Sequence, residues 1–178
     1  EYFAGQSIKQ AFVERRQPLV DFLRVGIQIA QTLGELHAQR IIHKDINSSN
    51  ILVNPETNSV KIIDFGLASR LDLQLEHLGN PEGLAYTLAY ISPEQTGRMN
   101  RVVDFRTDLY SLGVTFYEML SGRLPFISDD PLALVHAHMA MSPQPLNDYD
   151  RDIPSIISEI VMRLMAKNAE DRYQSALA

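Results

Sequence analysis

Residues 43–66 read HKDINSSNILVNPETNSVKIIDFG and are the most informative part of the sequence. Its middle holds two short apolar runs rich in β-branched residues, 51–53 and 60–63, separated by turn-forming residues. This pattern predicts a small β-hairpin. A polar cluster, HKDINSSN at 43–50, precedes the hairpin, and the tripeptide DFG at 64–66 follows it.

Helical periodicity dominates on both sides of the hairpin. Apolar residues at helical spacing predict an amphipathic helix over residues 19–37 and further helices over 131–141 and 154–165. Between residues 108 and 120 apolar side chains surround the axis, so this helix should be buried on nearly every side. Residues 71–99 show no sustained period, and such a stretch is usually functional or disordered; we favour a functional one. The predicted class is mostly α with a small β-hairpin.

Composition limits the classes of function. With 178 residues and 45% hydrophobic content, the chain can build one domain with its own core. A net charge of -6 offers no basic face, which argues against nucleic acid and a membrane surface as partners. The sequence has no cysteine, which excludes disulfides and thiolate metal sites, and no apolar run approaches the roughly 20 residues of a membrane span. We therefore expect a cytoplasmic protein without membrane insertion.

Four motifs occur in an order that resembles the large, C-terminal lobe of Hanks-type (eukaryotic-like) serine/threonine protein kinases. The cluster at 43–50 is similar to the catalytic loop H-R-D-L-x-x-x-N, and DFG at 64–66 to a metal-binding motif of the same family. TLAYISPE at 87–94 resembles T-x-x-Y-x-A-P-E, and DLYSLG at 108–113 resembles D-x-W-S-x-G. The resemblance implies a protein-kinase-like fold of which residues 1–178 form the large lobe only, truncated at both ends and without the small lobe.

The resemblance also assigns catalytic roles, since phosphoryl transfer requires positioning more than covalent chemistry. It implies that Asp45 orients the attacking hydroxyl, and that Thr87 favours a Ser or Thr hydroxyl of a protein substrate. Asn50 and Asp64 would bind Mg²⁺, which prefers hard oxygen ligands. Asn47 stands where these kinases usually carry a lysine that contacts the transferred phosphate. An amide can donate a hydrogen bond there but brings no charge.

For ATP, the resemblance implies that the backbone of Glu1 and Phe3 meets the adenine edge. Leu52 and Ile63 would line the adenine pocket. A truncated edge strand would explain Glu1 and Phe3 equally well, and core packing would explain Leu52 and Ile63.

Two carboxylates are expected to organise the lobe. The resemblance implies that Glu94 is buried against Arg172, although each charge taken singly is more often solvated. Asp108 either caps the helix that begins near it or, as the family implies, ties down the catalytic-loop backbone. His136 and His138 are two apart, which places them on different faces of a helix, and we assign no metal to them.

Several features depart from an active kinase. No Gly-rich loop, strand lysine or helix glutamate of a small lobe precedes Glu1, so this chain alone should bind ATP weakly and phosphorylate little. No Ser, Thr or Tyr occurs in residues 71–85, where an activation loop usually carries its phosphosite. We predict that Glu76 or Glu82 supplies a permanent anion for Lys44, unless all three are simply solvated.

Two functions therefore remain open at the level of sequence. Asp45, Asn50 and Asp64 favour a catalytic lobe, whereas Asn47 and the activation loop without an acceptor favour a pseudokinase-like regulatory module. Residues 89–101, AYISPEQTGRMNR, are similar to kinase modules that head large bacterial hybrid proteins with an ATP-binding module and a sensor histidine kinase. A small lobe and C-terminal signalling domains are thus expected partners in a parent protein.

Overall fold

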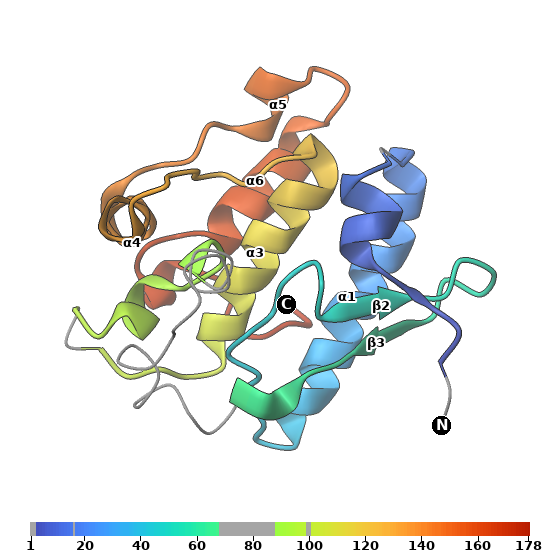
Figure 1. Cartoon of the computed structure of the whole chain (residues 1–178), viewed down its shortest axis with the longest axis horizontal. Coiled ribbons are helices and arrows are strands. Elements are labelled where there is room, and N and C mark those ends of the chain that lie inside the picture. The colour runs from blue at the N-terminus through green and yellow to red at the C-terminus, as the bar shows by residue number, and fades with distance from the viewer. Residues whose placement is uncertain (1–2, 16, 68–87, 99–100) are drawn as a thin grey trace.

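The chain forms a helical lobe with a small sheet at one side (Figure 1). The computed structural model describes residues 3–15, 17–67, 88–98 and 101–178. The helices are α1 (Leu19–Ala38), α3 (Arg106–Ser121), α4 (Pro131–Ala140), α5 (Leu146–Tyr149) and α6 (Ser155–Leu164), and the strands are β1 (Gln6–Ser7), β2 (Ile51–Val53) and β3 (Val60–Ile62). Short helical turns are the π-helix η1 (Lys9–Val13) and the 3₁₀ turns η2 (Phe65–Leu67), η4 (Pro93–Thr96) and η5 (Ala169–Asp171).

The predicted hairpin is confirmed and is part of a three-stranded antiparallel sheet in the order β1-β2-β3. Ile51 pairs with Ile62, and both side chains are buried against the helices. Because side chains alternate along a strand, Leu52 points to the opposite, outer face, where it is half-buried. The third strand, β1, was missed by the sequence analysis because two residues carry no alternation pattern.

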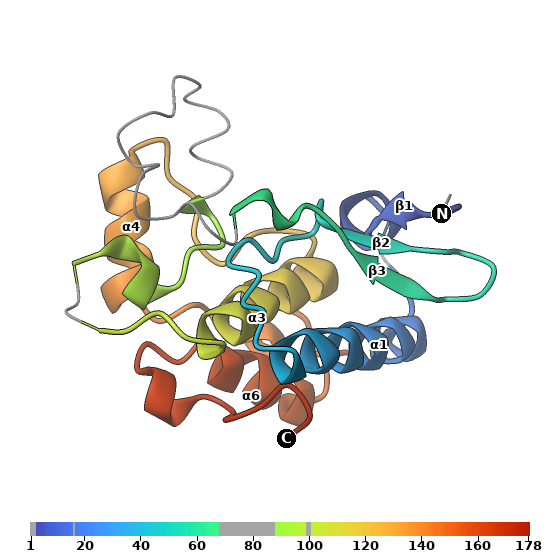
Figure 2. The ribbon, with the colours of Figure 1, turned by 90° about the horizontal axis from the view of Figure 1, so that it is seen from below.

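Helix α3 is the core of the lobe, as its apolar surround predicted. Every residue from Thr107 to Leu120 is buried. The helix packs against α1, α5, η1 and α6, and Figure 2 shows it beside α1 and above α6. Gly113 makes the contact with α6 possible, because a Cβ at this position would lie 2.7 Å from Leu164 Cβ and 2.8 Å from Met165 Cγ.

The helix boundaries agree with the predicted ranges to within two residues at each end. Of the aperiodic stretch at 71–99, the structure describes 88–98, which contains η4 and is buried from 88 to 96. No helix of the described ranges is both long enough and apolar enough to cross a membrane.

Candidate active site

The loop at 43–50 lies between α1 and β2 and is held in place by one buried carboxylate. Asp108 Oδ2 accepts the backbone N–H of His43 at 2.8 Å, and its Oδ1 accepts the N–H of Lys44 at 2.7 Å. His37 Nε2, in the last turn of α1, lies 2.9 Å from the same Oδ2. Asp108 is completely buried, so a charged group joins the core helix to the polar loop and to α1.

The capping alternative for Asp108 is wrong. Asp108 is the third residue of α3, and the N–H of Arg106 at the start of the helix is accepted by Asp104 Oδ1 at 2.8 Å. The loop-anchoring role that the resemblance implied for Asp108 is the one observed.

His43 joins the loop to the segment after β3. The N–H of Asp45 donates to His43 Nδ1 at 3.3 Å, so Nδ1 carries a lone pair and the ring proton resides on Nε2. That proton is donated to the carbonyl of Ile63 at 3.0 Å. The imidazole also packs on the ring of Phe65, with 4.8 Å between ring centroids. The polar loop and the DFG tripeptide therefore form one unit.

Asp45 lies at the centre of a small amide cluster. Asn47 Nδ2 donates to Asp45 Oδ1 at 3.1 Å, and Asn50 Nδ2 donates to Asp45 Oδ2 at 2.8 Å. Both amides also donate to the Asp45 carbonyl. Burial raises the pKa of the Asp45 carboxyl, and the two amides partly offset that rise. The amide hydrogen bonds thus fix the direction of the carboxylate.

Asn47 is buried and folded into its own loop. Its Oδ1 accepts the backbone N–H groups of Ser49 and Asn50, both at 3.0 Å. Its Nδ2 donates to Asp45, as described above. These hydrogen bonds stabilise the loop, and the predicted contact with a transferred phosphate stays a prediction.

Asp64, two residues after the end of β3, has a left-handed backbone conformation. Its φ is 64°, a region that non-glycine residues rarely adopt, and Lys44 on the polar loop has a φ of 67°. Asp64 Oδ1 accepts the N–H of Gly66 at 3.3 Å, which fixes the turn into η2. Two residues of the site therefore hold strained backbone.

Asn50 and the predicted adenine residues Leu52 and Ile63 share the outer face of the sheet. Leu52 pairs with Lys61 across β2 and β3, and the Ile63 N–H donates to the Asn50 carbonyl at 2.9 Å, so the alternation places Asn50, Leu52 and Ile63 on one face. Phe3 lies near this face, because Lys61 Nζ is 5.7 Å from the centre of its ring. Glu1 is outside the described residues.

Glu94 and Arg172 form the buried pair that the resemblance implied. Arg172 Nη1 contacts Glu94 Oε1 at 2.6 Å and Nη2 contacts Oε2 at 2.9 Å, a bidentate geometry. Thr107 Oγ1 also donates to Glu94 Oε1 at 2.9 Å. The pair fixes the segment at 88–98 to the residues after α6, and Gln95 Nε2 links the same segment to the Lys44 carbonyl at 2.9 Å.

Several predicted residues cannot be placed. Thr87, Glu76 and Glu82 lie outside the described residues, and the predicted anion for Lys44 is therefore untested. Conversely, His37 belongs to none of the sequence motifs, and its contact with Asp108 follows from the packing of α1 on α3.

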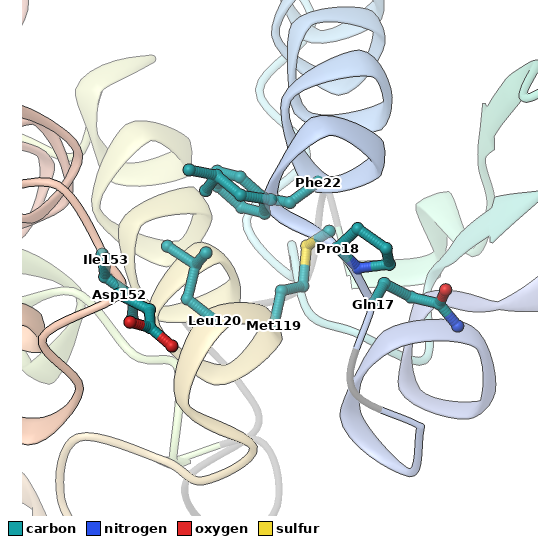
Figure 3. A pocket seen from close by; sticks show the side chains of 8 residues that line it. Gln17, Pro18, Phe22, Met119, Leu120, Asp152 and Ile153 are labelled. Atoms are coloured by element: carbon teal, nitrogen blue, oxygen red, sulfur yellow. The ribbon is translucent and has the colours of Figure 1, made fainter.

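A pocket of about 220 Å³ lies away from this cluster (Figure 3). It is lined by the start of α1, the end of α3 and the residues before α6. Its lining combines apolar side chains, among them Phe22, Met119, Leu120 and Ile153, with the polar groups of Gln17 and Asp152. It includes none of the predicted site residues.

A helical lobe that holds a carboxylate and two amides on a loop, joined by histidine to a DFG turn, defines the catalytic-loop architecture of protein kinases. The chain belongs to the protein kinase domain family, whose model matches residues 1–177.

Similar proteins include serine/threonine kinases of bacteria. A probable serine/threonine-protein kinase of Clostridium perfringens is 35% identical over 178 residues, which cover 99% of this chain and 25% of the relative. The serine/threonine-protein kinase PknB of Mycolicibacterium smegmatis is 36% identical over 146 residues, 82% of this chain and 23% of that protein. The chain thus spans about a quarter of the length of these relatives.

A hybrid signal transduction histidine kinase of Dictyostelium discoideum is 53% identical over 90 residues, 51% of this chain and 3% of that protein. This similarity agrees with the resemblance of residues 89–101 to the kinase modules of hybrid proteins.

Proposed function

We propose that this chain is the catalytic lobe of a serine/threonine protein kinase that transfers the γ-phosphoryl group of Mg-ATP to a Ser or Thr hydroxyl of a protein. The observation that carries the proposal is the Asp45 carboxylate, fixed by the amides of Asn47 and Asn50 on a loop that Asp108 anchors. A base held at a set angle is what transfer to a hydroxyl requires.

Asp45 accepts a hydrogen bond from the hydroxyl of the acceptor protein. This bond directs the hydroxyl oxygen at the γ-phosphorus of ATP. A bond forms between that oxygen and phosphorus while the bond to the bridging oxygen of ADP breaks, and the hydroxyl proton passes to Asp45. The Asn50 and Asn47 amides hold the carboxylate during this exchange. Because the hydrogen bonds behind the loop are buried and already formed, the loop needs little reorganisation during transfer.

Asn50 and Asp64 suit magnesium by their chemistry. Because Asn50 Nδ2 donates to Asp45 Oδ2, the amide oxygen of Asn50 points away from that carboxylate. Within the part of the chain that the structure describes, no three His, Asp or Glu side chains gather into a metal cage. Mg²⁺ is usually held by one or two protein ligands together with substrate phosphates, so this pair is sufficient. When bound, the ion neutralises phosphate charge.

The remaining assignments follow the family resemblance. We assign Leu52, Ile63 and the backbone of Phe3 and Glu1 to the adenine end of ATP, supported by the shared outer face of the sheet. Thr87 is assigned to the choice of a Ser or Thr acceptor. A cytoplasmic location and protein substrates complete the proposal.

The test is Mg-ATP binding by calorimetry, on this chain and on a longer chain that includes a Gly-rich small lobe. Each is compared with its Asp64→Asn variant. We expect clear binding by the longer chain that Asp64→Asn weakens at least tenfold, and weak binding by the 178-residue chain. Equal binding by wild type and variant would contradict the assignment of Asp64 to the Mg-ATP site.

A second measurement tests transfer itself. Phosphate incorporation into a mixed Ser/Thr peptide library by the longer chain should fall by about 10²- to 10⁴-fold in Asp45→Asn, because the base is lost. Incorporation that survives this change contradicts the role of Asp45.

A pseudokinase-like module is the second candidate, favoured by Asn47 at the usual lysine position and by the lack of a hydroxyl in residues 71–85. The hybrid histidine kinase relative supports a multidomain signalling parent with further C-terminal domains. Nucleotide binding by the longer chain without any transfer would select this candidate.

A further inference from the structure

Ser48 is a buried hydroxyl in the middle of the catalytic loop. Its Oγ lies 3.1 Å from the hydroxyl oxygen of Tyr90, and Tyr90 donates to Glu118 Oε2 on α3 at 2.5 Å. The three residues are 0%, 2% and 5% exposed, so water does not compete for these bonds. A hydrogen-bonded line therefore runs from the loop through the segment at 88–98 to the core helix.

The protons of this line have one consistent arrangement. Tyr90 owns a single hydroxyl proton, and it is donated to the Glu118 carboxyl group. Ser48 must then donate its own proton to the Tyr90 oxygen. Removing the Ser48 hydroxyl deletes one bond, whereas removing the Tyr90 hydroxyl deletes both and leaves a carboxyl group buried without this donor.

Both residues are also fixed by their backbones. The Ser48 carbonyl accepts the N–H of Lys9 at 2.9 Å, and the Tyr90 carbonyl accepts Ser111 Oγ at 2.8 Å. Ser48 directly follows Asn47, whose amide donates to Asp45 Oδ1. A shift of Ser48 is consequently passed to the group that holds the base.

We propose that Ser48 is a positioning residue that locks the loop carrying Asp45 to the segment that follows Thr87. The inference rests on the proposed kinase activity and adds a contact that the family motifs do not assign. Ser48 touches neither nucleotide nor acceptor; it sets the distance between the base and the segment that presents the hydroxyl. Loss of the bond should lower kcat and leave the KM for ATP unchanged.

The test uses the full-length protein with three variants: Ser48→Ala, Tyr90→Phe and the two combined. We expect about fivefold lower kcat for Ser48→Ala, the size of one lost buried hydrogen bond, with KM for ATP within twofold. Adding Ser48→Ala to Tyr90→Phe should cost no more than twofold further, because the shared bond is already gone. Ser142→Ala, an exposed serine after α4, is the matched control and should leave kcat unchanged.

Hydrogen exchange measured on the same proteins separates this proposal from the proposed activity. Ser48→Ala and Tyr90→Phe should both speed amide exchange at 43–50, and Ser142→Ala should not. If wild type transfers no phosphate, the kinase proposal fails and exchange alone decides the role of Ser48. Multiplicative effects in the double variant, a raised KM for ATP with unchanged kcat, or unchanged exchange at 43–50 would each overturn the positioning role.

Discussion

In the proposed kinase reaction, Asp45 is the residue whose surroundings should most directly set activity. Burial raises the pKa of its carboxyl, and the amide donors of Asn47 and Asn50 pull the pKa back down. The proposed transfer step needs the carboxylate, so kcat should fall as pH falls through this raised pKa. The acid limb of the pH profile therefore lies above the ordinary aspartate range.

Asn47→Ala should move that acid limb to higher pH, because it removes one of the donors that lower the Asp45 pKa. The measurement is kcat against pH for the full-length protein. Asn147→Ala on α5 is the matched control and should leave the limb in place. A shift to lower pH in Asn47→Ala would contradict the assigned direction.

Asp108→Asn should destabilise the fold and slow catalysis together. An amide can accept through one oxygen only, so either the His43 or the Lys44 N–H loses its buried acceptor. We expect a loss of about 1–3 kcal/mol in urea unfolding, with a larger fall in kcat than in ATP affinity. A variant with wild-type stability and kcat would show that the anchoring is redundant.

The parts of the site that could be predicted from the sequence are those encoded by local spacing. Asp45, Asn50 and Asp64 fall within recognisable motifs, and the Glu94 pair with Arg172 came from the family resemblance. The contacts of His37 with Asp108 and of Ser48 with Tyr90 join residues far apart in sequence. No periodicity encodes such pairs, because they arise only when the helices have packed.

Two helical glycines of this lobe, Gly113 and Gly26, differ in how closely the neighbouring helices approach them. A Cβ at Gly113 would lie 2.7 Å from Leu164 Cβ, whereas one at Gly26 would meet Phe116 Cζ at an ordinary 3.5 Å. Gly113→Ala should therefore force α3 from α6 and cost about 1–3 kcal/mol. Gly26→Ala should be neutral or gain up to about 1 kcal/mol from helix propensity. Thermal unfolding of both variants gives the comparison, and equal effects would contradict it.

The elements themselves were predictable where they were long. Periodicity located α1, α3, α4 and α6, since each presents enough turns to average out local exceptions. The short elements β1, η1 and α5 were not predicted. Their conformations are set by the neighbours they touch, as when β1 takes its register from β2.

At the scale of the whole molecule, the Glu94–Arg172 pair holds the segment at 88–98 to the end of the chain. Burial alone would raise the pKa of the Glu94 carboxyl, but the hydrogen bonds and charge of Arg172 outweigh it and leave the pKa below its ordinary value. The folded pKa thus lies below the unfolded one. The stability it contributes is complete above the ordinary value of 4.5 and is lost as pH falls through the folded pKa.

Glu94→Gln should cost about 3–5 kcal/mol at neutral pH, because Arg172 stays buried without its counter-charge. Below pH 4.5 the unfolding free energy of this variant should fall less steeply than that of wild type. Urea unfolding at several pH values measures both effects. Asp21→Asn, which breaks the exposed pair with Arg24, should change stability by less than about 1 kcal/mol; parallel pH curves for Glu94→Gln and wild type would refute the linkage.

The left-handed backbone at Lys44 and Asp64 has a consequence for heating. Each non-glycine residue in that region stores roughly 1–3 kcal/mol, which persists only while the surrounding contacts enforce it. As warming loosens those contacts, we expect the backbone at Lys44 and Asp64 to relax before the helices unfold. The temperature of inactivation should accordingly lie below the temperature of global unfolding. The interval between these two temperatures reports how much backbone strain Lys44 and Asp64 hold in the folded protein.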